Sequence, residues 1–128
     1  MPALDFKSEF AEPVSSGQKK QTIRRKRKKP IKVGDNLYLY TGQRSANCRP
    51  LGEAVATTVL PVTIHPSGMR IGEQELQQID LESIAVADGF ESFIDMSIWF
   101  FTTYKLNCFE GDLIAWQELL PPGSLRPG

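Results

Sequence analysis

The 128-residue chain is poor in the residues that the commonest catalytic and metal sites use. Its two cysteines, Cys48 and Cys108, are too few and too far apart to indicate a metal site or a disulfide framework, and we expect both to be reduced, half-buried thiols. Its one histidine, His65, lies beside a turn with no acid or cysteine neighbour, and we assign it no role. Because Ser-His-Asp and Cys-His catalysis need a histidine, we expect neither, and we expect no metal and no cofactor.

Long apolar segments and a glycine-rich phosphate loop of the usual spacing are also missing. No run approaches the roughly 18 consecutive apolar residues of a membrane span, and the N-terminal MPALDFKSEF lacks the apolar centre of a signal peptide. We therefore expect a cytoplasmic protein without a membrane partner. The length is that of one domain, which we place at residues 1–118, and the end of the chain, PPGSLRPG, predicts a flexible tail over residues 119–128.

The net charge of zero conceals a strong division along the chain. Residues 1–64 contain 12 Lys and Arg against 5 Asp and Glu, a net +7, whereas residues 65–128 contain 3 against 10, a net −7. Such a field offers a polyanion one side to approach, although a charged run of this kind can equally be a solvated loop. We call residues 25–29 the basic block and predict that they contact a nucleic-acid backbone: Arg25, Lys26, Arg27, Lys28 and Lys29.

The local patterns predict an α+β fold. A short helix over residues 8–17 should end at Gly17 and either kink at Pro13 or begin near Glu12. Strands are expected from about residue 20, over 36–42, over 52–65, near 69–72 and over 111–119, because β-branched and period-two segments alternate there with turns. Asp80 and Ser92 are expected to cap helices over 81–89 and 93–106. We expect a small β-barrel of about five to six strands flanked by two to three short helices.

Three polar residues near the first long strand form the candidate site. Thr22 and Arg24 are two apart and so point to the same face of an extended chain, and Lys19 precedes them at a turn. Their hydroxyl, guanidinium and ammonium groups can bind a phosphate, a carboxylate or a nucleobase carbonyl. A hydrolase also needs an acid, and Asp88 is the best placed, although it can equally bond local backbone amides.

Arginines in the loop GQRSANCRP are weaker candidates. Arg44 or Arg49 can contact a phosphate there, although such arginines more often form surface ion pairs. The aromatic residues of 93–104 recur every three or four positions, which is more typical of a helix face packed in the core than of a base-stacking surface.

A family resemblance rests on these same residues. Gly17, Lys19, Thr22 and Arg24 match the G-x-K-x-x-T-x-R motif of the ASCH domain, a member of the PUA-like superfamily, and FAEPVSSGQKKQTIR, IAVADGFES, WFFTTYKL and FEGDLIAW are similar to its other elements. The resemblance covers roughly residues 3–117 and is nearest to small bacterial or phage members. It implies a compact PUA-like barrel with a cleft between the motif and the second half of the chain. The ligand-binding candidates are then Gly17 and Arg24 of the motif, together with Arg44 of the polar loop.

The resemblance also implies two kinds of function. ASCH relatives bind RNA, and some small bacterial members remove the acetyl group from N4-acetylcytidine with a lysine, a threonine and a glutamate. Carried over, these are Lys19, Thr22 and the shorter acid Asp88, with Glu91 as an alternative acid and Arg24 holding the base carbonyl.

Three hypotheses follow from the sequence. The first is an RNA- or nucleotide-binding module whose cleft takes a nucleobase or a modified nucleoside while the basic block holds the backbone. The second is a hydrolase, either an N4-acetylcytidine amidohydrolase or a ribonuclease. The third is a phage protein that binds a protein partner through its acidic half.

Overall fold

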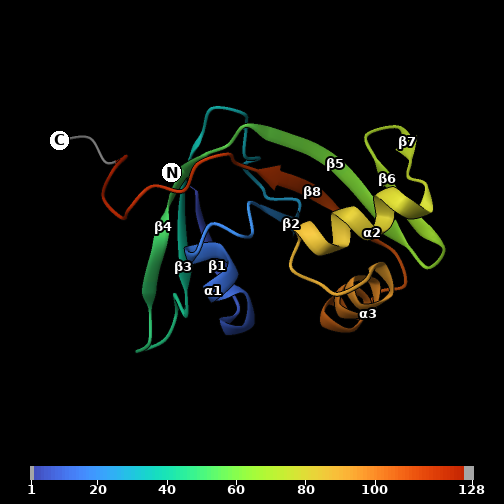
Figure 1. Ribbon diagram of the computed structural model, residues 1–128, viewed down its shortest axis with the longest axis horizontal. Helices are drawn as coiled ribbons and strands as arrows, with labels where there is room; N and C mark the ends of the chain where they lie inside the picture. Colours follow the sequence, from blue (N-terminus) through green and yellow to red (C-terminus); the bar gives the residue numbers. More distant parts are fainter. Residues whose placement is uncertain (1, 126–128) are drawn as a thin grey trace.

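The computed structural model describes residues 2–125 and has an α+β fold. Within that range it contains three helices and eight strands in two sheets, and all three helices lie on the concave side of an arch that the sheets form (Figure 1). The elements, in chain order, are β1 (Ala3–Phe6), α1 (Ser8–Ser15), β2 (Gln21–Arg25), β3 (Asn36–Thr41), β4 (Arg49–Val55), β5 (Thr58–His65), β6 (Gly68–Ile71), β7 (Gln74–Glu75), α2 (Gln78–Ala87), α3 (Phe93–Tyr104) and β8 (Phe109–Ala115).

The smaller sheet has the strand order β1-β3-β4 and is covered by α1. β1 runs parallel to β3, and β4 is antiparallel to it. α1 begins at Ser8 and contains Pro13, so the alternative of a start near Glu12 is wrong. A proline in a helix this short removes a single backbone hydrogen bond, and the buried face of Phe10, Ala11 and Val14 holds the helix on the sheet.

The larger sheet has the order β2-β8-β5-β6-β7, with α2 and α3 packed beneath it (Figure 1). The predicted strand over 52–65 is instead two strands, which break at Ala56 and Thr57 as the chain passes from one sheet to the other. The cap at Ser92 is confirmed, because its Oγ accepts from the backbone N–H of Asp95 at 3.1 Å. The cap at Asp80 is wrong: α2 starts at Gln78, and Asp80 lies in its first turn.

Two buried hydrophobic clusters meet where the site lies. One lies between α1 and the smaller sheet, and the other between the two later helices and the larger sheet. The half-buried rings of Phe90 and Trp99 pack against both clusters. The strands of residues 2–125 form two sheets and no closed barrel, so the predicted PUA-like barrel stays a prediction.

The last described residues lie against the smaller sheet. Leu120 pairs with Glu53 through the backbone, and the Glu53 carboxylate accepts from the backbone N–H groups of Gly123 and Leu125. Residues 126–128 of the predicted tail lie outside the described range, and the flexibility of the tail stays a prediction. Between residues 2 and 125, no helix has the length and apolar character needed to cross a membrane.

Candidate active site

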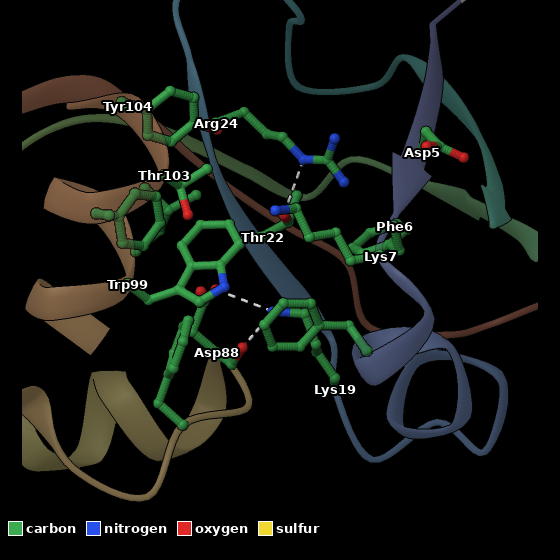
Figure 2. Close-up of a pocket in the computed structure, with 14 residues that line it drawn as sticks. Asp5, Phe6, Lys7, Lys19, Thr22, Arg24, Asp88, Trp99, Thr103 and Tyr104 are labelled. Carbon is green, nitrogen blue, oxygen red and sulfur yellow. Dashed lines mark hydrogen bonds and ion pairs between the residues drawn. The ribbon is translucent and has the colours of Figure 1, made fainter. Parts of the chain in front are cut away.

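A pocket opens between the two halves of the molecule, between α1 and β1 on one side and β2 and α3 on the other (Figure 2). Its volume is about 110 Å³, somewhat smaller than the roughly 150 Å³ cavity that can hold a benzene molecule. Because the pocket is also open at its mouth, a single planar ring can enter it. Its polar lining includes all three motif side chains and the predicted acid: Lys19, Thr22, Arg24 and Asp88.

Lys19 and Asp88 form a buried ion pair at one end of this pocket. Each residue is 3% exposed, and the Lys19 Nζ lies 3.2 Å from the Asp88 Oδ1. The same ammonium group also donates to the backbone carbonyl of Asp88, and Gln21 Nε2 donates to the Asp88 carboxylate at 3.3 Å. The structure therefore brings together two predicted residues that are 69 positions apart in the chain.

Two glycines let the chain present this pair. Gly17 has a φ of +82° and ends α1, after which the Lys19 N–H returns to the Pro13 carbonyl at 2.8 Å. Gly89 has a φ of +99° directly after Asp88, and a Cβ at this position would lie 3.2 Å from the Phe10 ring. Both turns use a left-handed backbone conformation that glycine adopts without steric penalty.

Burial shifts the pKa values of the pair in opposite directions. Desolvation lowers the pKa of Lys19 below its ordinary value, against the opposing effect of the Asp88 charge. Desolvation raises the pKa of Asp88, against the opposing effect of the Lys19 charge. Both shifts favour the neutral forms of the two groups, compared with an exposed lysine and an exposed aspartate. A buried pair of this kind in a pocket is typical of an acid and base that work in catalysis.

Thr22 and Arg24 lie on the same face of β2, as their spacing predicts. The Arg24 Nε donates to the Thr22 Oγ1 at 3.0 Å, which leaves the threonine hydroxyl proton available to a ligand. The Arg24 guanidinium lies 4.6 Å from the centroid of the Phe6 ring. Burial lowers the pKa of Arg24, but an arginine keeps its charge at any ordinary pH. The pocket thus has a fixed cation next to a hydroxyl group.

Aromatic rings make up most of the remaining wall. Phe100 is buried in the core, as the helical spacing predicted, and its ring also lines the pocket. The half-buried Tyr104 and Trp99 lie beside it on α3, contact its ring and extend the aromatic wall of the pocket. Sequence reasoning missed several other lining residues, for which the sequence carries no motif: Asp5, Phe6, Lys7, Phe10, Phe90 and Thr103.

Some predicted site residues lie outside this pocket. Gly17 positions Lys19 through the turn and does not line the cavity. Glu91 is exposed, and it is Asp88 that contacts Lys19. Arg44 and Arg49 are exposed, Arg44 in the loop between β3 and β4 and Arg49 at the start of β4.

The basic block continues from β2 along the surface, with all five side chains exposed. Arg25 lies 5.1 Å from the centroid of the Tyr104 ring and so reaches the edge of the pocket. Lys26 forms an ion pair with Asp112 at 2.9 Å, and Arg27 donates to the Ala3 carbonyl at 3.5 Å. Arg27 and Lys29 line a second surface hollow, and the exposed Lys28 lies between them in the sequence.

Two expectations about side-chain surroundings are wrong. Cys48 and Cys108 are free thiols as expected, but both are exposed because each lies in a surface loop. His65 does have an acid neighbour, since the hairpins of β5, β6 and β7 bring Glu75 to 3.3 Å from its Nε2. A contact between His65 and Glu75, which are ten positions apart, can be predicted only when the strand pairing is known.

A comparison of the chain with models of protein families, with curated proteins and with solved structures found no match. The site is therefore interpreted from its own residues, and membership of the ASCH family stays a prediction.

Proposed function

We propose that this chain is an ASCH-like protein of the PUA-like type that hydrolyses an acyl amide on a nucleobase, with N4-acetylcytidine as the model substrate. The single observation that carries the proposal is the buried Lys19–Asp88 pair, which lies in a ring-sized pocket beside the Thr22 hydroxyl. A site that only binds a neutral base has no need of a desolvated acid and base. The aromatic walls suit a planar base, whose ring can stack on them.

In the proposed reaction, neutral Lys19 takes a proton from water as the water oxygen bonds to the acyl carbon. Thr22 donates a hydrogen bond from its hydroxyl group to the developing oxyanion and keeps its proton, because its oxygen already accepts from Arg24. The C–N bond then breaks, and the leaving amine nitrogen receives a proton from the Lys19–Asp88 pair. The products are acetate, one released proton and the free 4-amino group of cytidine.

Acetate release from N4-acetylcytidine tests this proposal. We expect turnover by the wild-type chain, and a loss of about 100-fold or more in Lys19→Met, since positioned acid-base groups contribute about 10²–10⁴-fold. Lys20→Met is the matched control, because Lys20 is exposed and does not line the pocket. Asp88→Asn keeps the size of the side chain and should lose activity to a similar extent. Turnover that is absent in the wild type, or unchanged in Lys19→Met, contradicts the proposal.

A second candidate function, binding of single-stranded RNA, is favoured by a separate observation. The exposed basic block begins at the edge of the pocket, where Arg25 stacks on Tyr104. An RNA chain whose base enters the pocket would meet these cations with its phosphates, which supply affinity without sequence preference. Binding of a cytidine-rich oligoribonucleotide at increasing salt tests this function. Affinity that is absent at low salt contradicts it.

A further inference from the structure

The mouth of the pocket carries two cations that the proposed hydrolysis does not use as acid or base. Lys7 precedes α1, and its exposed side chain places Nζ 5.1 Å from the centroid of the Trp99 ring. Arg24 comes from β2 and is half-buried against Phe6. Both side chains line the pocket, although they come from its two opposite walls.

These two cations keep most of their hydrogen-bonding capacity. Arg24 uses its Nε–H on Thr22, which leaves the four N–H groups of its terminal nitrogens. Across residues 2–125, neither Lys7 nor Arg24 takes part in an ion pair with a carboxylate. Asp5 is the acid at this end of the pocket, and its Oδ1 accepts from the backbone N–H of Gln43 at 2.8 Å. Glu9 lies nearby, since its Oε1 accepts from Trp99 Nε1 at 3.4 Å, but it does not line the pocket, so among the lining groups at this end one carboxylate accompanies two cations.

The charged groups lie at different depths, so the pocket has a buried end and an open end. Lys19 and Asp88 are buried, Arg24 is half-buried and Lys7 is exposed. Figure 2 shows Lys19 and Asp88 toward one end and Arg24 toward the other, with Thr22 between them. In a cytidine nucleotide, the 4-amino group and the 5′-phosphate lie at opposite ends of the molecule. An acyl amide held at the Lys19–Asp88 pair therefore directs the phosphate to the mouth.

We propose that Lys7 and Arg24 form a phosphate subsite, so that the substrate class is a nucleoside phosphate rather than a free nucleoside. The assignment rests on the proposed function for the direction in which the base enters. A planar guanidinium and a mobile ammonium suit a phosphate, because its oxygens accept a bidentate contact from arginine and a point-charge contact from lysine together. The phosphate is either the terminal monoester of a mononucleotide or a diester of a chain.

Calorimetric titration with cytidine, cytidine 5′-monophosphate and ribose 5-phosphate tests the subsite. We expect the monophosphate to bind at least about tenfold more tightly than cytidine, since its phosphate adds charge-assisted hydrogen bonds. Lys7→Gln, an exposed change at a helix start, should remove most of this preference of the monophosphate over cytidine. Lys20→Gln removes the same charge outside the pocket and should keep the full preference.

A trinucleotide with a terminal cytidine phosphodiester distinguishes the two phosphate sources. Binding that is tighter than that of the monophosphate assigns the subsite to the phosphodiester of a chain, and weaker binding assigns it to the phosphate of a mononucleotide.

The outcomes separate this inference from the proposed function. Equal affinity for cytidine and its monophosphate, or a preference that survives Lys7→Gln, overturns the subsite even if N4-acetylcytidine is hydrolysed. Ribose 5-phosphate binding that depends on Lys7, together with no hydrolysis of N4-acetylcytidine, supports the subsite and rejects the amidohydrolase. Absence of binding by all three ligands overturns the subsite.

Discussion

Lys19 and Asp88 are the two side chains on which the proposed chemistry depends, and burial acts on them in opposite senses. An ordinary lysine is protonated at neutral pH and cannot act as a base, whereas a desolvated lysine loses its proton more readily. An ordinary aspartate has no proton to donate, whereas a desolvated one keeps its proton to a higher pH. The same burial therefore prepares both the base and the acid.

The pH dependence of hydrolysis follows from the sign of these shifts. Neutral Lys19 should be needed, so kcat/KM should rise with pH as Lys19 loses its proton, with a midpoint below the ordinary lysine value of 10.5. The Asp88 charge raises the pKa of Lys19, so Asp88→Asn should move this rising limb to lower pH. Measurement of kcat/KM against pH for both proteins checks the direction. A limb that moves to higher pH contradicts the assigned roles.

Stability measurements can distinguish a structural ion pair from a functional one. Lys19→Met leaves a buried carboxylate without its partner and should lower the free energy of unfolding by about 3–5 kcal/mol. The double variant Lys19→Met/Asp88→Leu replaces the pair with apolar groups and should recover most of that loss, yet remain inactive. Urea unfolding together with acetate release checks both properties. Recovery of activity along with stability would show that the pair serves the fold alone.

The turn between α2 and α3 positions Asp88 in the site, and Gly89 in this turn has a left-handed conformation in which an added Cβ would lie 3.2 Å from the Phe10 ring. Gly89→Ala should lower the free energy of unfolding by about 2–3 kcal/mol and displace Asp88, which lowers activity as well. Gly72→Ala is the matched control, since Gly72 has a φ of +61° and open space around it, and it should lose about 1 kcal/mol with activity kept. Equal losses in the two variants would contradict a steric conflict between an added Cβ at Gly89 and the Phe10 ring.

Elements with strong local signals were predicted well from the sequence. Ser92 caps α3 and Gly17 ends α1. Both effects are local, because a capping hydrogen bond or a left-handed turn involves only residues a few positions apart in the sequence. The site residues of β2 also follow from local spacing, since alternation along a strand places Thr22 and Arg24 on one face.

Elements that depend on distant partners were predicted poorly. β1 has only four residues and pairs in parallel with β3 across α1, so no turn signal marks it, and Lys7 beside it was missed as a pocket residue. Asp88 could be named as a candidate, but its contact with Lys19 depends on how the two hydrophobic clusters meet. The choice between a catalytic acid and a local cap therefore needed the tertiary structure.

The molecule as a whole is divided in charge, and the basic block begins at the last residue of β2, the strand that carries Thr22 and Arg24, and continues beyond it. If RNA phosphates contact this block, log affinity for single-stranded RNA should fall linearly with log salt. Replacing Lys28 and Lys29 by glutamine should reduce the magnitude of the slope by about 1.4, at about 0.7 for each phosphate contact. Arg70→Gln is the control, because Arg70 pairs with the exposed Glu75 at the far side of the larger sheet. An unchanged slope in the lysine variant excludes a backbone contact there.

The proposed function depends on the buried Lys19–Asp88 pair acting on an acyl amide in the pocket. Acetate release from N4-acetylcytidine, measured side by side for the wild type, Lys20→Met and Asp88→Asn, tests that claim most directly. We expect turnover by the wild type and by Lys20→Met, and a loss of about 100-fold or more in Asp88→Asn. A wild-type chain that releases no acetate, or an Asp88→Asn chain that releases it at the wild-type rate, would contradict the claim.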